Sequence, residues 1–340
     1  MKSAAIIGTG LIGTSIGLGL RACEWHVVGW DRDPAIAAAA LARGGLSAVA
    51  SDEADACTGP HDLVVLAAPP AAAEDFVRRS DAPWLTIDTA GAKSAVTQAN
   101  NMARFVGTHP MAGREVSGPA AATASLFNGA AWVVTTDGAA VADVEEAEEI
   151  LRSLGARPVR MTSADHDAAV AAISHLPQLL AASLVGLAGD HPEAMELAAG
   201  SFRDLTRVAG SDPALWLDVL AANRRDVLAA VTELQERLSG LAVLLESGDL
   251  ASLEEQLDTS RKVRGSLAAR ATEVRVALAD QPGELAKVGA ALSTARADVR
   301  DIQLRHAPYG GGGVLTISVR PGDAGTLIDA IRAVGLVLAE

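Results

Sequence analysis

A glycine-rich turn near the N-terminus has the spacing that binds a nucleotide. Residues 8–13 read Gly-Thr-Gly-Leu-Ile-Gly and directly follow a short apolar run that predicts a strand. Gly8 permits a tight turn, Gly10 lets the backbone approach a pyrophosphate, and Gly13 lets a helix pack closely on a sheet. The motif therefore predicts a dinucleotide site, with a glycine-rich turn that binds nothing as the alternative.

The residues beside this turn indicate how the dinucleotide is held and which one it is. Leu11 and Ile12 open the predicted helix, whose free amides can bind the phosphates. Asp31 ends the next apolar strand, where its carboxylate would accept hydrogen bonds from the adenosine ribose and repel a 2′-phosphate. This favours NAD over NADP. Arg32, the next residue, could instead bind that phosphate, which is the alternative.

A histidine follows a later predicted strand. Residues 107–115 read Gly-Thr-His-Pro-Met-Ala-Gly-Arg-Glu. Because ligands of doubly wound folds bind beyond the carboxyl ends of the strands, we expect His109 to face the nicotinamide. A neutral imidazole there can take a proton from a hydroxyl while a hydride leaves the same carbon. The alternative is a hydrogen-bonded structural histidine.

Two arginines in the second half could bind an acidic substrate. Residues 201–207 read Ser-Phe-Arg-Asp-Leu-Thr-Arg and precede a predicted helix. Arginines near a helix junction, Arg207 among them, can hold carboxylates through paired N–H donors. A surface ion pair with Asp204 is an equally good interpretation.

Two further histidines lie in a long apolar helical pattern. His175 precedes Pro177, which cannot donate to the carbonyl one turn earlier, so we expect the helix to bend there and expose a polar group. His166 lies nine residues before His175, about half a turn out of phase on a continuous helix. We therefore expect His166 to serve a strand–helix junction and not the same site.

The elements that would position these residues alternate through the first half of the chain. Short β-branched runs alternate with Ala-rich helical patterns, which predicts a parallel sheet covered on both faces. Strands are expected at residues 4–7, 26–30, 63–67, 85–87, 105–107, 132–135 and 157–161, with a helix at 141–154. Residues 1–164 are thus predicted to be a doubly wound α/β domain.

The chain from residue 165 to residue 268 has no strand pattern. A helix can start at Ser163 or Asp165, and the pair Asp212-Pro213 has the cap and first-turn residues of another. Apolar residues at three- and four-residue spacing predict further helices over 214–245 and 250–267. We expect an all-helical domain that carries the interface of a homodimer.

Residues 269–340 change character again. Patterns of strand and helix follow one another as βαββαβ, the order of the ferredoxin-like motif. Strands are expected at 273–279, 299–305, 314–319 and 336–338, and helices at 284–295 and 323–334. A turn at residues 280–283 opens the first helix, whose amides can receive a carboxylate, and Ile302 on the neighbouring strand could bind an ammonium group through its backbone.

Composition restricts the class of protein. The 42 Asp and Glu exceed the 28 Lys and Arg, which argues against a nucleic-acid binder. Cys23 and Cys57 are too few for a disulfide scaffold or a structural zinc site, and we expect no metal. The uncharged stretches 3–20, 116–136 and 168–189 are interrupted by glycine, proline or polar residues. We therefore expect no membrane segment and a reduced, cytoplasmic setting.

Three of these motifs together resemble the prephenate dehydrogenase family, and the resemblance covers essentially the whole chain. They are T-H-P-M-A-G-R-E at 108–115, S-H-L-P at 174–177 and F-R-D-L-T-R-V-A-x-S-D-P-x-x-W at 202–216. The resemblance implies a Rossmann-type domain in which NAD⁺ takes a hydride from the ring carbon that bears the 4-hydroxyl of prephenate. The ring carboxylate leaves as CO₂, which gives 4-hydroxyphenylpyruvate for L-tyrosine biosynthesis.

The same resemblance implies roles for individual residues. His109 would be the base that polarises the 4-hydroxyl, and Arg207 would bind a substrate carboxylate. His175 and Glu115 would line the pocket, with Glu115 tuning or gating it, and Trp216 would pack beneath it.

One segment departs from the family's Asp-x-Gly-Ser-x-Lys pattern. Residues 88–93 read Asp-Thr-Ala-Gly-Ala-Lys, so Gly91 replaces the serine that often supports the catalytic histidine. Thr89, Ser94 or a water would then have to supply that support.

The C-terminal residues 269–340 resemble an ACT domain, a module that senses amino acids. Its D-x-P-G turn corresponds to Asp280, Pro282 and Gly283. The end product of the pathway, L-tyrosine, is then the expected effector, bound at this turn and at Ile302. A module that merely holds a dimer together is the alternative. Because the chain begins at its first strand, we also expect no fused chorismate mutase domain.

Other functions stay open on the sequence. An arogenate dehydrogenase differs in a pocket detail, because arogenate carries an amino group in place of the side-chain keto group. A β-hydroxyacid dehydrogenase shares the two-domain plan but more often uses a lysine on the helical domain. A catalytically silent regulator that binds NAD and an amino acid would need neither His109 nor Arg207.

Overall fold

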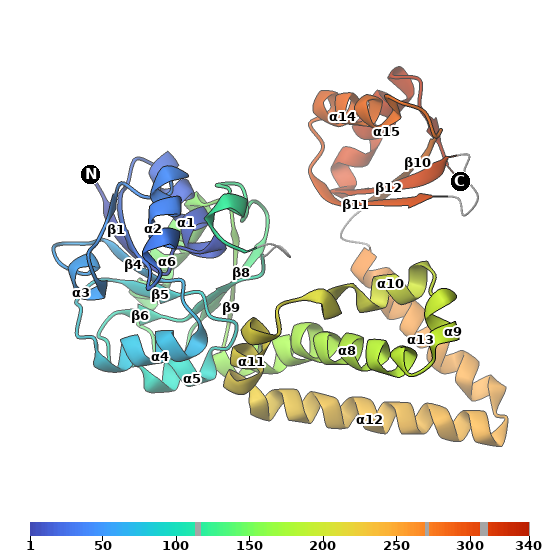
Figure 1. Ribbon diagram of the computed structural model, residues 1–340, viewed down its shortest axis with the longest axis horizontal. Helices are drawn as coiled ribbons and strands as arrows, with labels where there is room; N and C mark the ends of the chain where they lie inside the picture. Colours follow the sequence, from blue (N-terminus) through green and yellow to red (C-terminus); the bar gives the residue numbers. More distant parts are fainter. Residues whose placement is uncertain (113–116, 269–271, 307–311, 340) are drawn as a thin grey trace. The chain divides into compact units, whose positions relative to one another are not determined.

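The computed structural model describes residues 1–112, 117–268, 272–306 and 312–339 (Figure 1). The chain divides into two compact units, residues 1–236 and residues 237–340. The first unit contains the glycine-rich turn and all the histidines and arginines singled out above.

Six parallel strands form the main sheet of the first unit, in the order β3-β2-β1-β4-β5-β6. They are β1 (Ser3–Ile7), β2 (His26–Trp30), β3 (Ala48–Val49), β4 (Leu63–Leu66), β5 (Thr86–Asp88) and β6 (Phe105–Val106). The connecting helices are α1 (Leu11–Ala22), α2 (Pro34–Ala42), α3 (Glu53–Ala56), α4 (Pro70–Arg79) and α5 (Ser94–Ala99). The doubly wound α/β fold is confirmed, with the strand order reversing between β1 and β4.

Two predicted strands lie outside this sheet, which corrects the sequence analysis. β8 (Ala131–Thr135) pairs in parallel with β9 (Arg157–Met161) and antiparallel with β7 (Thr108–Pro110). The sequence did not predict β7, because it has 3 residues and ends in proline. β7 carries His109 opposite Val133 of β8, so a separate three-stranded sheet holds this histidine.

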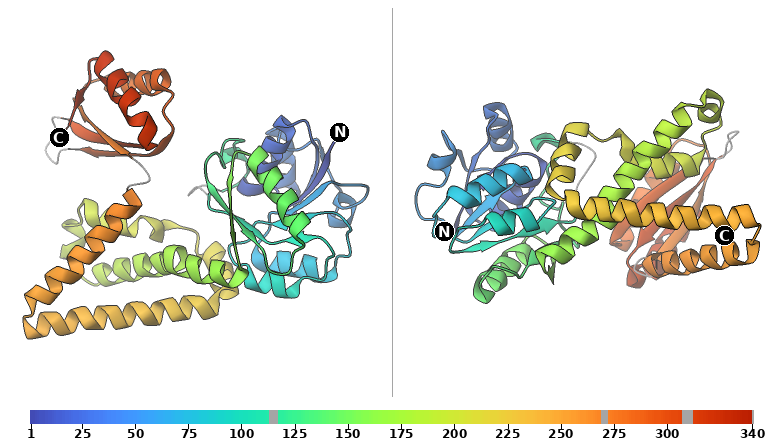
Figure 2. Two further views of the ribbon diagram at one scale, coloured as in Figure 1. Left: turned by 180° about the vertical axis from the view of Figure 1, so that it is seen from behind. Right: turned by 90° about the horizontal axis from the view of Figure 1, so that it is seen from below.

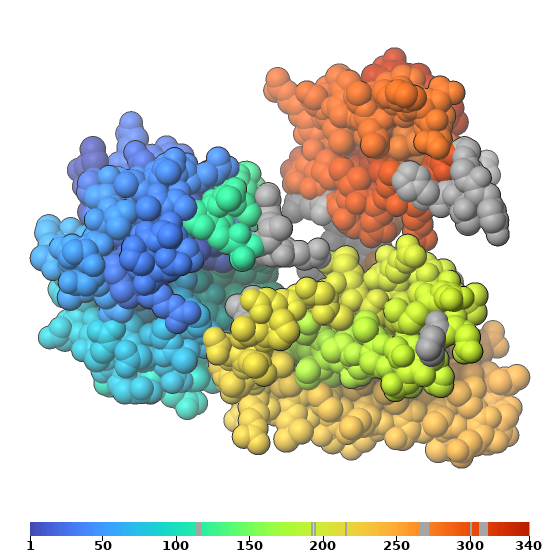
Figure 3. Space-filling view, in the orientation of Figure 1, coloured from blue at the N-terminus to red at the C-terminus, as the bar shows by residue number. Residues whose placement is uncertain are grey.

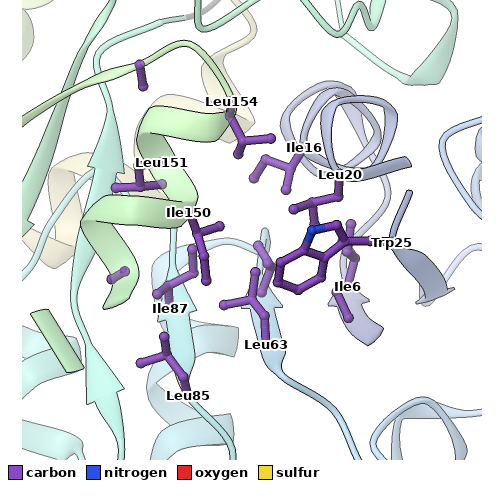
Figure 4. Close-up of a cluster of buried hydrophobic side chains, with 14 of the residues drawn as sticks. Ile6, Ile16, Leu20, Trp25, Leu63, Leu85, Ile87, Ile150, Leu151 and Leu154 are labelled. Carbon is purple, nitrogen blue, oxygen red and sulfur yellow. The ribbon is translucent and has the colours of Figure 1, made fainter. Parts of the chain in front are cut away.

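The main sheet is buried on both faces because alternate residues of a strand point to opposite sides. Ala4 and Ile6 of β1 pack on one face with α1, α2 and α6 (Val141–Ser153), the cluster drawn in Figure 4. Ala5 and Ile7 pack on the other face with α3, α4 and α5. These two cores explain why the strands read as continuous apolar runs.

The chain beyond β7 returns to the nucleotide-binding half of the unit. A 3-10 turn at Pro119–Ala121 packs against α1 and α2 at the surface (Figure 3). Arg43, just after α2, donates to the carbonyl of Ala122 at 3.0 Å, and Thr123 donates its backbone N–H to Ser15 of α1 at 3.2 Å. These bonds tie the segment that follows His109 to the helix that follows the glycine-rich turn.

Helices follow β9, as predicted. They are α7 (Ser163–Val170), α8 (Leu176–Gly189), α9 (Pro192–Glu196), α10 (Gly200–Thr206), α11 (Pro213–Ala222) and α12 (Arg224–Ser247), with a π turn at Ala171–His175 and a 3-10 turn at Arg207–Gly210. Asp212 caps α11 as expected, by accepting from the amide of Ala214 at 2.9 Å. α7, however, is capped by Thr162 and not by Ser163 or Asp165. The helix expected over 214–245 is broken at Asn223, which ends α11.

A single helical stretch of the described ranges, Ser163–Gly189, is long and apolar enough to cross a membrane by length and composition. It includes His166, Asp167 and His175, each at most 2% exposed. The polar groups of these three side chains take part in the hydrogen bonds described below.

The second unit contains the rest of α12, then α13 (Leu250–Ala268) and the βαββαβ segment that the sequence predicts. Its elements are β10 (Thr272–Leu278), α14 (Glu284–Ala295), β11 (Val299–His306), β12 (Gly313–Val319), α15 (Ala324–Ala333) and β13 (Val337–Leu338). The strands form an antiparallel sheet in the order β11-β12-β10-β13, and α14 and α15 lie together on one face of it (Figure 2). This arrangement is that of the ferredoxin-like motif.

Candidate active site

The glycine-rich turn between β1 and α1 has the geometry of a dinucleotide cradle. Gly8 has φ +91°, and a Cβ there would lie 2.4 Å from the carbonyl oxygen of Ala67. A Cβ on Gly13 would lie 1.9 Å from the carbonyl oxygen of Gly8, whereas a Cβ on Gly10 would meet nothing within 4 Å. Gly8 and Gly13 are thus required by close packing, and the side of the turn at Gly10 is open to a ligand.

Two further features of this cradle fit an NAD-type ligand. Gly10 is the N-cap of α1 and has no side chain to cap it, so the first amides of α1, those of Leu11 and Ile12, are available to a phosphate. Asp31 directly follows β2 and accepts from the amide of Thr9 at 2.7 Å. A carboxylate has further acceptor capacity, which leaves Asp31 able to bind ribose hydroxyls. Arg32 lies beside it with an exposed side chain.

His109 is the first member of a hydrogen-bonded chain of three side chains. Its Nδ1 lies 2.9 Å from Nε2 of His166, and the two rings meet edge to face at 78°. Nδ1 of His166 lies 2.8 Å from Oδ1 of Asp167. The expectation that His166 serves only a strand–helix junction is therefore wrong, because β7 brings His109 against the first turns of α7.

Asp167 anchors the far end of this chain. Its Oδ1 accepts from the amide of Lys93 at 2.7 Å and its Oδ2 from the amide of Ser94 at 2.8 Å, at the start of α5. Burial alone would raise the pKa of Asp167, but hydrogen bonds from His166, Ser94 and Lys93 lower it to about 2. Asp167 is therefore ionised under any ordinary condition.

His175 joins the same cluster from the π turn. Its Nδ1 lies 3.2 Å from Nδ2 of Asn223, which also donates to the backbone carbonyl of Asp167 at 2.8 Å. The ring of Trp216 lies 6.1 Å away, edge to face. On a continuous α-helix His175 would point away from His166, but the wider π turn between them changes the phase. The expected irregularity before Pro177 thus takes the form of a π turn.

A buried ion pair lies behind His109. Lys93 and Asp88 are both fully buried, and Nζ of Lys93 donates to the Asp88 carboxylate and, at 2.7 Å, to the backbone carbonyl of Thr108. Oδ1 of Asp88 accepts from the amide of Thr108 at 3.0 Å. The sequence analysis gave this pair no role. A charged residue of each sign in a segment that directly follows a buried strand was the signal for it.

The surroundings hold His109 neutral. Burial, followed by the neighbouring His166, Lys93 and His175, lowers the pKa of His109 well below its usual value of 6.5. Burial and His166 likewise lower the pKa of His175. A neutral imidazole at His109 can accept a hydrogen bond from a substrate hydroxyl.

Gly91 lies next to the free edge of the His109 ring. A Cβ on Gly91 would be 3.9 Å from Cε1 and Nε2 of His109 and 3.9 Å from Cγ1 of Val219, all ordinary contacts. The support for His109 does not come from Thr89, which bonds the carbonyl of Leu66, or from Ser94, whose amide bonds Asp167. It comes from His166, which the sequence had led us to place at a strand–helix junction.

The remaining predicted substrate residues are spread over the helical part. Arg207 starts the 3-10 turn after α10, which packs against α8, and its side chain is exposed. Trp216 is on α11 and reaches the cluster through His175. Glu115 lies outside the described residues, so its predicted role stays a prediction.

A pocket in the second unit is lined by three of the four residues predicted to bind an effector, and not by the fourth, Ile302. It has a volume of about 250 Å³ and lies between the end of β10, the start of α14 and β11. Asp280, Pro282 and Gly283 line it, as predicted, and Gly283 has φ +96° at the N-cap of α14. On β11 the lining residue is Leu304, and Ile302, two residues earlier, is 49% exposed.

Two family models match most of the chain. The model of the nucleotide-binding domain of prephenate dehydrogenase matches residues 16–160, and that of the prephenate dehydrogenase dimerization domain matches residues 162–259. Prephenate dehydrogenase of Bacillus subtilis is 30% identical, in an alignment that covers 95% of this chain and 94% of the relative.

Two solved structures of dehydrogenases have a fold similar to that of this chain. Prephenate dehydrogenase from A. aeolicus, in complex with hydroxyphenyl propionate and NAD⁺, aligns with a TM-score of 0.72 and 25% identity over 78% of this chain and 98% of the other. Arogenate dehydrogenase from Synechocystis aligns with a TM-score of 0.67 and 26% identity over 78% of this chain and 100% of the other.

Proposed function

The chain belongs to the prephenate dehydrogenase family, and from this we propose that it catalyses the NAD-dependent oxidative decarboxylation of prephenate to 4-hydroxyphenylpyruvate. The observation that carries the proposal is a neutral His109, bonded through Nδ1 and open at Nε2, on the same unit as a glycine cradle that fits NAD. This reaction makes the protein an oxidoreductase.

The reaction needs a hydrogen-bond acceptor at the 4-hydroxyl and no net proton transfer. NAD⁺, when bound, supplies the hydride acceptor at the ring carbon that bears this hydroxyl. Nε2 of His109 accepts a hydrogen bond from the hydroxyl while that carbon loses its hydride, which lowers the cost of the positive charge that develops there. The bond to the ring carboxylate breaks, its electron pair makes the ring aromatic, and the proton stays with the phenol oxygen of the product.

Residues of the helical part would hold the substrate. We assign a substrate carboxylate to Arg207, whose guanidinium presents paired donors. His175 and Trp216, in edge-to-face contact, would form one wall of the pocket, and Glu115 would complete it. Gly8, Gly10 and Gly13, with the amides of Leu11 and Ile12 and the carboxylate of Asp31, would hold the cofactor.

Arogenate is the second candidate substrate, favoured by the likeness to the Synechocystis arogenate dehydrogenase. The purified protein should be given prephenate and arogenate side by side, each with NAD⁺, while NADH and CO₂ are measured. We expect both products to form with prephenate at the higher kcat/KM. A higher value with arogenate would make the chain an arogenate dehydrogenase, and no product with either would contradict an enzymatic role.

The C-terminal βαββαβ segment is proposed to be an ACT domain that binds L-tyrosine and inhibits the enzyme. The pocket at Asp280, Pro282 and Gly283 supports this, because the first amides of α14 can bind an α-carboxylate. Its aliphatic lining, Leu285 and Leu304 included, suits an apolar side chain.

Two further observations bear on assembly and location. We propose a homodimer, because residues 162–259 match a dimerization domain and helices in this range expose large apolar side chains such as Leu187, Leu228 and Leu238. A cytoplasmic location is proposed from the free thiols of Cys23 and Cys57, which fit a reducing compartment.

A further inference from the structure

The direction of each hydrogen bond in the His109 chain can be worked out from Asp167. A carboxylate only accepts hydrogen bonds, and Asp167 is held ionised by the amides of Lys93 and Ser94, at 2.7 and 2.8 Å. The contact of 2.8 Å between Asp167 and Nδ1 of His166 therefore has His166 as the donor.

His166 must then act as an acceptor at its other nitrogen. His166 is 1% exposed and, in its neutral form, carries one ring proton, which Asp167 accepts from Nδ1. A neutral imidazole with its proton on Nδ1 has a lone pair on Nε2. At 2.9 Å, His109 donates to that lone pair through its own Nδ1.

This leaves Nε2 of His109 without a proton and free to accept. Gly91 places no side chain against that edge of the ring, since even a Cβ there would stay 3.9 Å from Nε2. A histidine protonated on Nε2 would instead present a donor to the substrate hydroxyl and could not take its proton.

We propose that His166 and Asp167 are positioning residues that fix His109 in the tautomer protonated on Nδ1, so that Nε2 is the acceptor. The support that Gly91 cannot give is thus supplied by an imidazole and a carboxylate on α7. The tautomer itself does not depend on the proposed function, which enters only in naming the substrate hydroxyl that Nε2 receives.

Two substitutions of His166 separate this role from simple packing. His166→Gln keeps an acceptor near the place of Nε2, whereas His166→Phe fills the same ring volume without one. If His166 fixes the tautomer, His166→Phe should lower kcat by about tenfold to 100-fold with the KM for NAD⁺ unchanged, and His166→Gln should lose much less. His61→Phe is the matched control, because His61 is a hydrogen-bonded histidine of the same unit, with the backbone carbonyl of Ala56 as partner, but lies by Trp84, away from the cluster. It should keep the wild-type kcat.

The tautomer can be read directly, without substrate. ¹⁵N NMR of the histidine side chains distinguishes an imidazole protonated on Nδ1 from one protonated on Nε2. We expect His109 to be protonated on Nδ1 in the wild type and in His166→Gln, and to become a mixture in His166→Phe. A wild-type His109 protonated on Nε2 would overturn the inference, and so would a His166→Phe enzyme at least as active as His166→Gln. Failure of the proposed function would show differently, as absent turnover with the NMR result intact.

Discussion

At the scale of single residues, the site is an arrangement that keeps one imidazole neutral. His109 is bonded on one side to His166 and lies near Lys93 and His175, and burial together with these neighbours outweighs Asp167 and disfavours a second proton on the ring. Because the pKa of His109 lies well below 6.5, the ring is a neutral acceptor at neutral pH. Three predictions concern this scale.

His109→Asn should replace the basic imidazole by a far less basic amide and leave the cofactor cradle intact. Loss of a general base usually costs about 10²–10⁴ in rate, so kcat should fall within that range. The KM for NAD⁺ should stay near the wild-type value, because the cradle is built from the turn between β1 and α1. Steady-state kinetics with prephenate measures both constants, and turnover close to that of the wild type would refute the assignment of the base.

The decline of kcat in acid should occur at a lower pH than it would with an ordinary histidine as the base. Because the pKa of His109 in the folded protein is well below 6.5, kcat should stay level as the pH falls through 6.5 and decline only in more acidic buffer. Stability should behave differently. Below pH 6.5 the unfolded chain binds a proton at this residue that the folded chain does not. The free energy of unfolding should therefore decrease as the pH is lowered through this range. A kcat profile with its midpoint at 6.5 would contradict a His109 whose pKa is lowered by its surroundings.

Asp31 should decide the choice of cofactor. Asp31→Ser removes the charge that repels a 2′-phosphate, so the preference for NAD⁺ over NADP⁺ in kcat/KM should narrow. Asp33→Ser is the control, since Asp33 caps α2 by accepting from the amide of Ala35 and serine can do the same. Its cofactor preference should stay as in the wild type. A wild-type preference for NADP⁺ would instead make Arg32 the determinant.

At the scale of elements, the buried pair Lys93–Asp88 joins the end of β5 to the start of β7. Lys93 and Asp88 each bond the backbone of Thr108, one residue before His109. Two buried charges gain little net stability as a pair, but each is costly without the other. The pair therefore fixes the place where the chain leaves the main sheet and enters the second one.

Lys93→Met should destabilise the first unit strongly, because it leaves the carboxylate of Asp88 buried without a cation. Breaking such a pair costs about 3–5 kcal/mol. Urea unfolding at neutral pH measures the loss, and the double variant Lys93→Met with Asp88→Asn should recover part of it. Arg78→Met, which removes an exposed ion pair with Glu74, should leave the midpoint almost unchanged. A double variant no more stable than the single one would contradict this account.

At the scale of the whole molecule, the catalytic cluster and the proposed effector pocket belong to different compact units. The cluster uses residues of the first unit, and the pocket uses residues of the second. Regulation would then require coupling between units, which is typically about 1–3 kcal/mol.

Removing the βαββαβ segment tests that coupling. A chain that ends at Ala268 should keep its activity with prephenate and lose inhibition by L-tyrosine. Activity assays with increasing L-tyrosine compare it with the full chain. If both are inhibited equally, L-tyrosine binds at the active site. If the full chain is insensitive, the segment has another role, such as holding a dimer together.

The sequence alone determined the local features of this protein. The glycine spacing, Asp31 at a strand end and the βαββαβ order were all predicted, because each depends on a few neighbouring residues or on a short hydrophobic period. His109 was recognised as a candidate base for the same reason, since it follows a buried strand in a doubly wound fold.

Tertiary structure decided which distant residues meet and what charge they carry. His166 and Asp167 are far from His109 in sequence, and only the departure of β7 into a second sheet brings the three together. The period of a continuous α-helix predicted that His166 and His175 lie on opposite sides of the helix. A π turn, which the hydrophobic period of the sequence does not reveal, changes their relative orientation. The lowered pKa of His109 likewise depends on burial and on neighbours from several elements, so no single segment of the sequence predicts it.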